Sequence, residues 1–469
     1  MEITKENHLI HRKLSDCSTQ FLDFVKENPD TLQRSNFSAL LSDERYTYFK
    51  SQPWPTFINE KRKQEMEEAV RKVGNLIKSI PGRFFDYDPH KISRYYEIPE
   101  NVIRMLFHGV GEDYINNLLG RGDFIFSPTS GLKCLEFNMQ ATLGGWELDL
   151  LEPLYIDTPI IAEFFNKYRV RLNKNHFFPL LLDHLIDRAL DHFGNAPGFE
   201  NEINMAIVLL DDIEVGEGDV EKRLKELYKK SLRRKNNALK GELMFCYYRR
   251  LKVIDHNVTV RDKKVHIYLE RCNCLVPPDV MEVLNAGNVL LYNGPLGVLL
   301  TDKLNLALLS EHEDSDIFNS EEREAIKKYI PWTRKITAAE TTYGTEKIKL
   351  DDFMIANRDR LVIKPSAGFG GRDVLVGFNT SPDQWKRQVE KAIRGKKWLV
   401  QEYVPSFSYV YQAGEQGCAL FHAVWGLFVF GSRYAGGFVR IMPETGTTGV
   451  INTKLGAEES IILEVREQE

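Results

Sequence analysis

The stretch LVIKPSAGFGG, residues Leu361–Gly371, decides how this chain is interpreted. An apolar run typical of a β-strand delivers Lys364, and a loop with Gly368, Gly370 and Gly371 follows it. Glycine lets the backbone approach a ligand closely, so backbone amides can cradle phosphate oxygens while the lysine supplies a point charge. The stretch therefore predicts nucleotide binding, although taken alone it is equally typical of an ordinary β-hairpin.

A second stretch, CLEFN at Cys134–Asn138, carries two oxygen ligands on one strand and is followed by Gly144 and Gly145. Residues two apart on a strand project from the same face, so we expect Glu136 and Asn138 to lie side by side. A carboxylate and an amide oxygen are ligands that a hard divalent cation such as Mg²⁺ prefers. The pattern predicts a magnesium site, but carboxylates are also common on exposed strand faces.

A third feature is the strand Trp398–Pro405, which contains Gln401, Glu402 and Tyr403. This strand is either the plain edge of a sheet or a hinge against which an adenine base lies. In the second interpretation backbone groups of residues 401–403 meet the base edge, and the Glu402 carboxylate accepts protons from the ribose or the amino group. This strand lies about thirty residues after a strand that carries a lysine and the glycine loop that follows it. Their occurrence together favours the interpretation as an adenine hinge.

The composition is that of a soluble globular protein. The chain has 469 residues, of which 43% are hydrophobic and 28% charged, and a formal net charge of −5. That length is expected to form roughly two to four domains. The charge predicts no nucleic-acid partner, and the basic run 229–235 is expected to be a solvated helix face. No apolar run is long enough to span a bilayer, the first residues are polar and the six cysteines are scattered. We therefore expect a cytoplasmic protein with no membrane partner.

The pattern along the chain predicts four segments. Residues 1–112 are expected to be a helical region, in which a helix over 61–79 ends at Ile80-Pro81-Gly82. Residues 113–195 carry a β-hairpin with the Glu136/Asn138 strand, and then helices. Residues 196–312 alternate strand and helix, which predicts an open sheet of Rossmann type, with a short hairpin between 258–260 and 265–269. No G-x-G-x-x-G follows its first strand, which argues against a dinucleotide cofactor. Residues 313–469 hold the glycine loop and the hinge strand.

Together these features resemble the ATP-grasp fold, in which two α/β lobes clamp ATP. The usual ATP-grasp order places the Glu-x-Asn strand after the hinge, whereas here it precedes the glycine loop by more than 200 residues. That order resembles the circularly permuted ATP-grasp enzymes, which include eukaryotic glutathione synthetase, glutathionylspermidine synthetase and bacterial relatives. The likeness covers about residues 115–460 and also includes Arg121–Phe126, Asn293–Pro295, Leu300–Lys303, Ile330–Arg334 and Gly436–Arg440.

The resemblance implies an α/β (α+β) fold, namely a circularly permuted ATP-grasp fold with an inserted Rossmann-like substrate domain and a helical N-terminal region. It also implies ATP and Mg²⁺ as ligands. Arg121 and Arg440 would face the substrate carboxylate or acyl phosphate, a task that suits a planar guanidinium better than an ammonium. Glycine loops at 368–371 and 446–449 would close over the reacting centre. The implied phosphate ligands are Lys303, Lys364, Gly368, Gly370 and Gly371, the implied adenine contacts are Gln401, Glu402 and Tyr403, and the implied metal ligands are Glu136 and Asn138.

Two departures from the family pattern leave the implied metal site incomplete. Glutathione synthetase carries a glutamate in its glycine loop, where this chain has Ser366-Ala367-Gly368. Ordinary ATP-grasp enzymes carry an acid on the strand that here reads Phe421–Trp425, where His422 is more simply a structural residue.

The function implied by the resemblance is that of an ATP-dependent carboxylate–amine ligase. It would activate a small carboxylic acid as an acyl phosphate, join it to an amine, amino acid or peptide, and release ADP and phosphate. No Ser-His or Cys-His arrangement points to a side-chain nucleophile, which fits such a reaction. Two alternatives remain open, a non-catalytic ATP-binding scaffold or regulatory module and a small-molecule phosphotransferase, and so does a homodimeric state.

Overall fold

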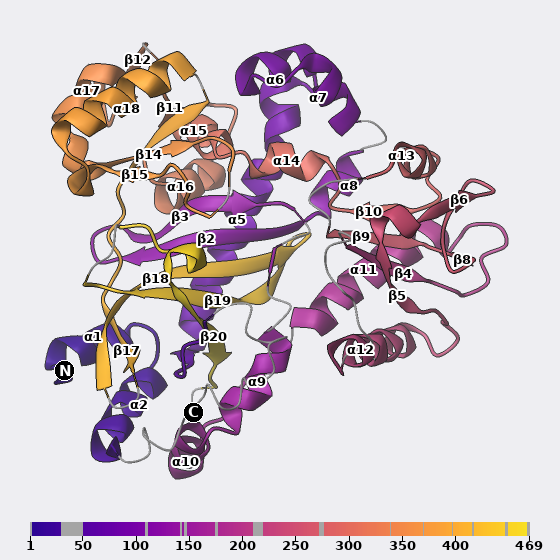
Figure 1. Ribbon diagram of the computed structural model, residues 1–469, viewed down its shortest axis with the longest axis horizontal. Coiled ribbons are helices and arrows are strands. Elements are labelled where there is room, and N and C mark those ends of the chain that lie inside the picture. The colour runs from indigo at the N-terminus through magenta and orange to yellow at the C-terminus, as the bar shows by residue number, and fades with distance from the viewer. Residues whose placement is uncertain are drawn as a thin grey trace.

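The computed structural model describes residues 2–29, 50–107, 111–140, 143–144, 148–173, 177–209, 219–271, 276–337, 339–368, 370–395, 397–414, 417–445 and 449–466. Gly145, the loop at 446–448 and the close cysteine pair at 272 and 274 lie outside these ranges. The described residues form a mixed α/β fold with a central sheet, a parallel sheet and a smaller antiparallel lobe (Figure 1).

The central sheet joins strands from distant parts of the chain. Its order is β1-β20-β19-β18-β2-β3, with β17 paired to β18. Only the pairing of β1 with β20 is parallel. The strands are β1 (Thr56–Ile58), β2 (Leu119–Ser127), β3 (Gly131–Asn138), β17 (Tyr409–Ala413), β18 (Gly417–Phe430), β19 (Arg433–Pro443) and β20 (Glu458–Glu464).

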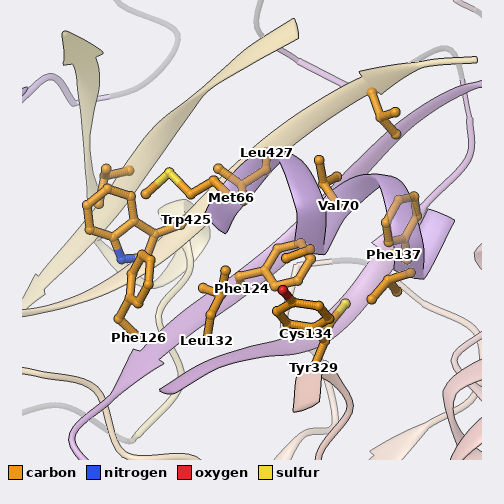
Figure 2. Packing of buried hydrophobic residues seen from close by; sticks show 14 of the residues in the cluster. Met66, Val70, Phe124, Phe126, Leu132, Cys134, Phe137, Tyr329, Trp425 and Leu427 are labelled. Carbon is orange, nitrogen blue, oxygen red and sulfur yellow. The ribbon is translucent and has the colours of Figure 1, made fainter. Parts of the chain in front are cut away.

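Helix α5 (Glu60–Phe85) covers one face of this sheet, and its apolar stripe forms the core together with β2, β3 and β18 (Figure 2). Met66 and Val70 of the helix are fully buried, as the sequence period predicts. The expected end of the helix at Ile80-Pro81-Gly82 is wrong. Pro81 lies inside the helix, which continues because Phe85 is buried and a left-handed residue, Asp86, closes the last turn.

The rest of the N-terminal region is helical in its described part, but it is continuous with the central sheet through β1. Shorter helices of this region and of residues 112–168 pack on the same core. These helices are α1 (Lys5–Arg12), α2 (Asp16–Glu27), α6 (Pro89–Tyr96), α7 (Glu100–Leu106), α8 (Glu112–Asn116), α9 (Leu148–Ile156) and α10 (Pro159–Tyr168).

A parallel sheet lies in the segment 196–312, where strand–helix alternation predicts an open α/β sheet. Its order is β10-β9-β4-β5, and all its pairs are parallel. Helices α11 and α12 cover one face, and α13 with β7 covers the other. The elements are β4 (Met205–Leu209), β5 (Leu243–Tyr247), β9 (Ile267–Arg271), β10 (Leu290–Tyr292), α11 (Phe177–Phe193), α12 (Asp219–Lys235) and α13 (Pro278–Asn285).

The hairpin expected between 258–260 and 265–269 is wrong in its second arm. Residues Ile267–Leu269 are buried on both faces, so this run lies inside the parallel sheet as part of β9. The separate antiparallel sheet consists instead of β6 (Lys252–Ile254), β7 (Asn257–Val260) and β8 (Lys263–Lys264).

The smaller lobe is an antiparallel sheet in the order β11-β16-β14-β15, seen above the central sheet in Figure 1. Helices α17 and α18 bury one of its faces through Trp385, Val389 and Met354. The other face looks toward the hairpin of β2 and β3. The lobe and its connections comprise α14 (Leu296–Thr301), α15 (Leu304–Glu311), α16 (Ser320–Tyr329), β11 (Thr333–Lys335), β12 (Glu340–Tyr343), β13 (Glu346–Lys349), α17 (Leu350–Ala356), β14 (Leu361–Pro365), β15 (Leu375–Val376), α18 (Pro382–Gly395) and β16 (Trp398–Glu402).

Candidate functional site

A pocket of about 890 Å³ lies between the smaller lobe and the central sheet. One wall comes from β2, β3, β18 and β19, and the other from β14, β15 and β16, so parts of the chain that are distant in sequence meet there. Its lining includes Asp123, Ile125, Leu135, Glu136, Lys303, Val362, Lys364, Gly368, Gly371, Arg372, Val376, Gln401, Glu402, Tyr403, Val404, Val424, Arg440 and Gly449–Asn452.

Most residues singled out from the sequence belong to this lining. Arg121, Asn138 and Gly370 do not, although Arg121 contacts the lining residue Asp123 and Gly370 precedes Gly371. The roles given to all of them remain predictions. The residues of the lining that the sequence pointed to are Glu136, Lys303, Lys364, Gly368, Gly371, Gln401, Glu402, Tyr403 and Arg440.

The two lysines enter the pocket from different elements. Lys303, just before α15, has its Nζ 3.4 Å from Glu136 Oε2 and donates a hydrogen bond of 2.9 Å to the carbonyl of Gly368. Lys364, on β14, donates to Gln401 Oε1 at 2.7 Å. Burial lowers the pKa of Lys364 to about 8, and the Lys303 charge adds to this while Glu136 opposes it. Two ammonium groups therefore meet around one carboxylate.

Asp123 on β2 is a site residue that the sequence analysis missed. Its side chain is buried, 2% exposed as a residue, yet it lines the pocket. Arg121 donates to it with both nitrogens of its fork, at 2.7 and 3.0 Å, and Arg440 donates at 3.1 Å. Burial alone would raise the pKa of Asp123, but the two guanidiniums outweigh it and lower that pKa to about 2. Asp123 is thus held ionised.

Both arginines that the resemblance assigns to the substrate contact carboxylates of the protein, and their role toward a substrate stays a prediction. Arg121 is committed to Asp123 and to the carbonyl of Leu143. Arg440 is shared between Asp123 and Glu459, whose Oε1 lies 3.3 Å from Arg440 Nε. Both guanidiniums converge on a carboxylate of the protein, and only Arg440 also reaches the pocket.

A β-bulge brings the second carboxylate into the pocket. Asp123 is the register partner of Glu136, and Phe124 is the partner of Cys134, so Leu135 is the extra residue. Because of this insertion, Cys134 and Phe137 can both face α5 in the core while Leu135 and Glu136 both line the pocket (Figure 2). Asn138 lies opposite Arg121 in the same pairing, and its Nδ2 is buried with no hydrogen-bond partner among the described residues.

The glycine loop packs against the segment that follows β19. Gly370 and Gly371 have φ of 76° and 70°, a region that other residues rarely adopt. A Cβ at Gly371 would lie 2.9 Å from Val450, and one at Gly370 would lie 2.8 Å from the side chain of Lys454. Glycine is needed here both for the turn and for the close approach of these two segments.

The hinge strand differs in detail from the expectation. The backbone N–H of Glu402 donates to Trp332 and that of Tyr403 donates to Arg360, both at 2.8 Å. The Glu402 carboxylate, which belongs to the pocket lining, lies 3.5 Å from Arg360 Nη2. In the described part of the chain the next N–H, that of Val404, has no hydrogen-bond partner. An apolar slot between Val362, Val376 and Val404 would suit a flat base.

The charges that line the described pocket suit an anion bound with a cation. They are four cations, Lys303, Lys364, Arg372 and Arg440, and three carboxylates, Asp123, Glu136 and Glu402. No group of three or more His, Cys, Asp or Glu side chains in the described ranges could hold a metal ion. Mg²⁺ usually takes one or two protein carboxylates and completes its shell with phosphates and water. The Asp123 and Glu136 carboxylates of the lining fit such an ion, whereas Asn138 lies outside the lining and its role as a ligand stays a prediction.

Two other segments of the resemblance, Asn293–Pro295 and Leu300–Lys303, connect separate parts of the fold through hydrogen bonds. The Asn293 side chain donates to the carbonyls of Leu119 and Met139, both at 2.6 Å, and so joins the parallel sheet to β2 and β3. Asp302 accepts from Ser366 at 3.3 Å, which anchors the loop after β14. His422 does not belong to this lining.

No protein-family model matches this chain, and no curated protein matches it. Among solved structures, a similar chain is described as a "Putative gamma-glutamylcysteine synthetase" from Methylobacillus flagellatus KT. It has a TM-score of 0.42 and 11% sequence identity, and the match covers 83% of this chain and 88% of that chain. Within the described residues, no helix is both long and apolar enough to cross a membrane. A likeness at this level leaves the function to be argued from the residues of the chain itself.

Proposed function

We propose that this protein is an ATP-dependent carboxylate–amine ligase of the circularly permuted ATP-grasp type, with Mg²⁺ as cofactor. The observation that carries the proposal is the convergence of Lys303, Lys364, Asp123 and Glu136 in one pocket with a glycine loop above it and an apolar slot beside it. Phosphoryl transfer needs chiefly positioning and charge neutralisation, and this pocket supplies both.

In the proposed reaction a substrate carboxylate oxygen attacks the γ-phosphorus, and the bond to the bridging oxygen of ADP breaks. An amine then attacks the acyl carbon, phosphate leaves with the bonding electrons, and the amine loses a proton to give the amide. Lys303 and Lys364 would contact the phosphates, and Asp123 and Glu136 would hold Mg²⁺, whose charge offsets that of the phosphates. The glycine loop and the segment at 449–455 would exclude water from the acyl phosphate.

The proposed first half-reaction can be tested before the amine is known. The protein is incubated with MgATP, a panel of amino acids and small carboxylic acids, and hydroxylamine, which captures an acyl phosphate as a hydroxamate. Formation of ADP and hydroxamate in equal amounts, with one class of acid, supports the ligase. ADP formation that needs a hydroxyl acceptor indicates a phosphotransferase instead, and MgATP binding without ADP formation under any condition indicates a non-catalytic module.

A further inference from the structure

A chain of buried hydrogen bonds leads from the backbone to Lys364. Lys364 Nζ donates to Gln401 Oε1 at 2.7 Å, and Gln401 Nε2 donates to Thr333 Oγ1 at 3.0 Å. Thr333 Oγ1 in turn donates to the carbonyl of Pro331 at 2.8 Å. Gln401 is 1% exposed and Thr333 is fully buried. The bond between Gln401 and Thr333 is therefore shielded from water, whereas Lys364 is half-buried and lines the pocket.

The number of protons on each group determines which group donates in each of these hydrogen bonds. A threonine hydroxyl has one proton, and the carbonyl of Pro331 can only accept it. The Thr333 oxygen must therefore accept its second bond, so the donating amide nitrogen of Gln401 has to face it. The amide oxygen is then left facing Lys364, and this orientation favours a charged ammonium over a neutral amine.

The sheet sets these residues on one face. Thr333 on β11 is the register partner of Gln401 on β16, and Gln401 is the partner of Val362 on β14. Lys364 lies two residues beyond Val362, so the two side chains project from the same face of the sheet. Lys364 is therefore the diagonal neighbour of Gln401 on that face. The opposite face, with Ile363 and Val400, packs on the helices of the lobe.

Lys364 retains a donor for a ligand. Its ammonium has three protons, of which one goes to Gln401 and one points to the carbonyl of Leu135 at 3.4 Å. The third can meet a phosphate oxygen in the pocket. The titratable and charged groups that face Lys364 or share its pocket are Glu136, Lys303, Cys134, Asp123, Arg372, Glu402, Tyr403 and Arg440.

We propose that Thr333 and Gln401 are positioning residues that aim the Lys364 ammonium at the phosphates of the nucleotide. The nucleotide part of this inference rests on the proposed function, whereas the effect on Lys364 does not. Gln401 then acts through Lys364 rather than through the adenine base, and the threonine of the Ile330–Arg334 segment acquires a role in the site.

The decisive readout is the pKa of the Lys364 amine in the ligand-free protein, measured by side-chain NMR and assigned by loss of the signal in Lys364→Met. We expect about 8 in the wild type, because burial disfavours the charge. Thr333→Val frees Gln401 to rotate and should lower this pKa by about one unit, while Gln401→Glu should raise it by at least about one unit. Thr333→Ser keeps the hydroxyl and should restore the wild-type value.

The second readout is MgATP affinity measured calorimetrically across pH 6 to 9. Thr333→Val should weaken binding about tenfold at neutral pH, the usual effect of losing a hydrogen bond to a charged group. The matched control is Thr380→Val in the same lobe, which removes a buried hydroxyl bonded to the carbonyl of Val376 and should change neither readout.

The inference is overturned if the pKa of Lys364 in Thr333→Val and in Gln401→Glu is the same as in the control variant Thr380→Val. If that pKa moves as expected but the wild type does not bind MgATP, the effect on Lys364 stands and the proposed function fails. The two results are thus distinguishable.

Discussion

Asp123→Asn is expected to lower the free energy of unfolding by about 3 kcal/mol at pH 7. Asp123 is buried and accepts three hydrogen bonds from Arg121 and Arg440. Breaking a buried ion pair by removing one partner costs about 3–5 kcal/mol, because the other charge stays behind uncompensated. We take the lower end of that range, since Arg440 keeps Glu459 as a partner at 3.3 Å.

The pH dependence of this effect has a definite sign. The pKa of Asp123 is lowered from 3.8 in the unfolded chain to about 2, so its contribution is fully present above pH 3.8 and is lost as the pH falls through 2. That difference alone corresponds to about 2 kcal/mol. The stability difference between wild type and Asp123→Asn should therefore stay constant from pH 7 to about 4 and shrink below it.

Urea unfolding followed by both tryptophan fluorescence and circular dichroism measures this difference. Asp314→Asn is the matched control, because the Asp314 side chain is 78% exposed in its pair with Lys327 and its loss should cost less than about 0.5 kcal/mol. A loss below about 1 kcal/mol for Asp123→Asn, or a difference that does not shrink in acid, would refute the view that the arginines hold an ionised Asp123.

Three further predictions concern the nucleotide and the acid. Lys364→Ala should lower turnover at least about 10²-fold in a folded protein, since a desolvated phosphate contact is lost, and steady-state kinetics with circular dichroism checks this. MgATP affinity of the wild type should fall as the pH rises through about 8, where Lys364 loses its proton, and a titration series that stays flat to pH 9.5 would contradict it. Arg440→Lys keeps the charge but loses the fork that joins Asp123 to Glu459, so turnover or the apparent affinity for the acid should fall while MgATP binding persists. Unchanged kinetics for the acid would make Arg440 purely structural.

Local patterns in the sequence were sufficient to locate most of the pocket. An apolar strand followed by glycines identified Lys364 and its loop, and strand–helix alternation gave the parallel sheet of residues 196–312. These signals are local because side-chain period and glycine content are fixed over a few residues. The burial of β9 on both faces, which removed it from the expected hairpin, depends on strands that are distant in sequence.

Asp123, which the sequence analysis did not identify, shows what local sequence patterns cannot predict. Asp123 lies two residues after Arg121 and directly before the apolar residues Phe124–Phe126. A carboxylate at the start of this apolar run was the signal in the sequence that could have identified it. Its meaning depends on register, because Asp123 meets Glu136 only through a bulge at Leu135. Likewise, the side chain of Gln401 turns toward Lys364 because Thr333 lies on the neighbouring strand, a contact that no spacing along the chain predicts.

The most direct test of the central claim is a crystal structure with Mg²⁺ and a non-hydrolysable ATP analogue. We expect the phosphates between Lys303 and Lys364, the base in the slot beside Val404, and a magnesium ion about 2.1 Å from oxygens of Asp123 or Glu136. A nucleotide bound elsewhere, or an ion more than about 4 Å from Asp123, Glu136 and Asn138, well beyond direct coordination, would contradict the assignment of this pocket.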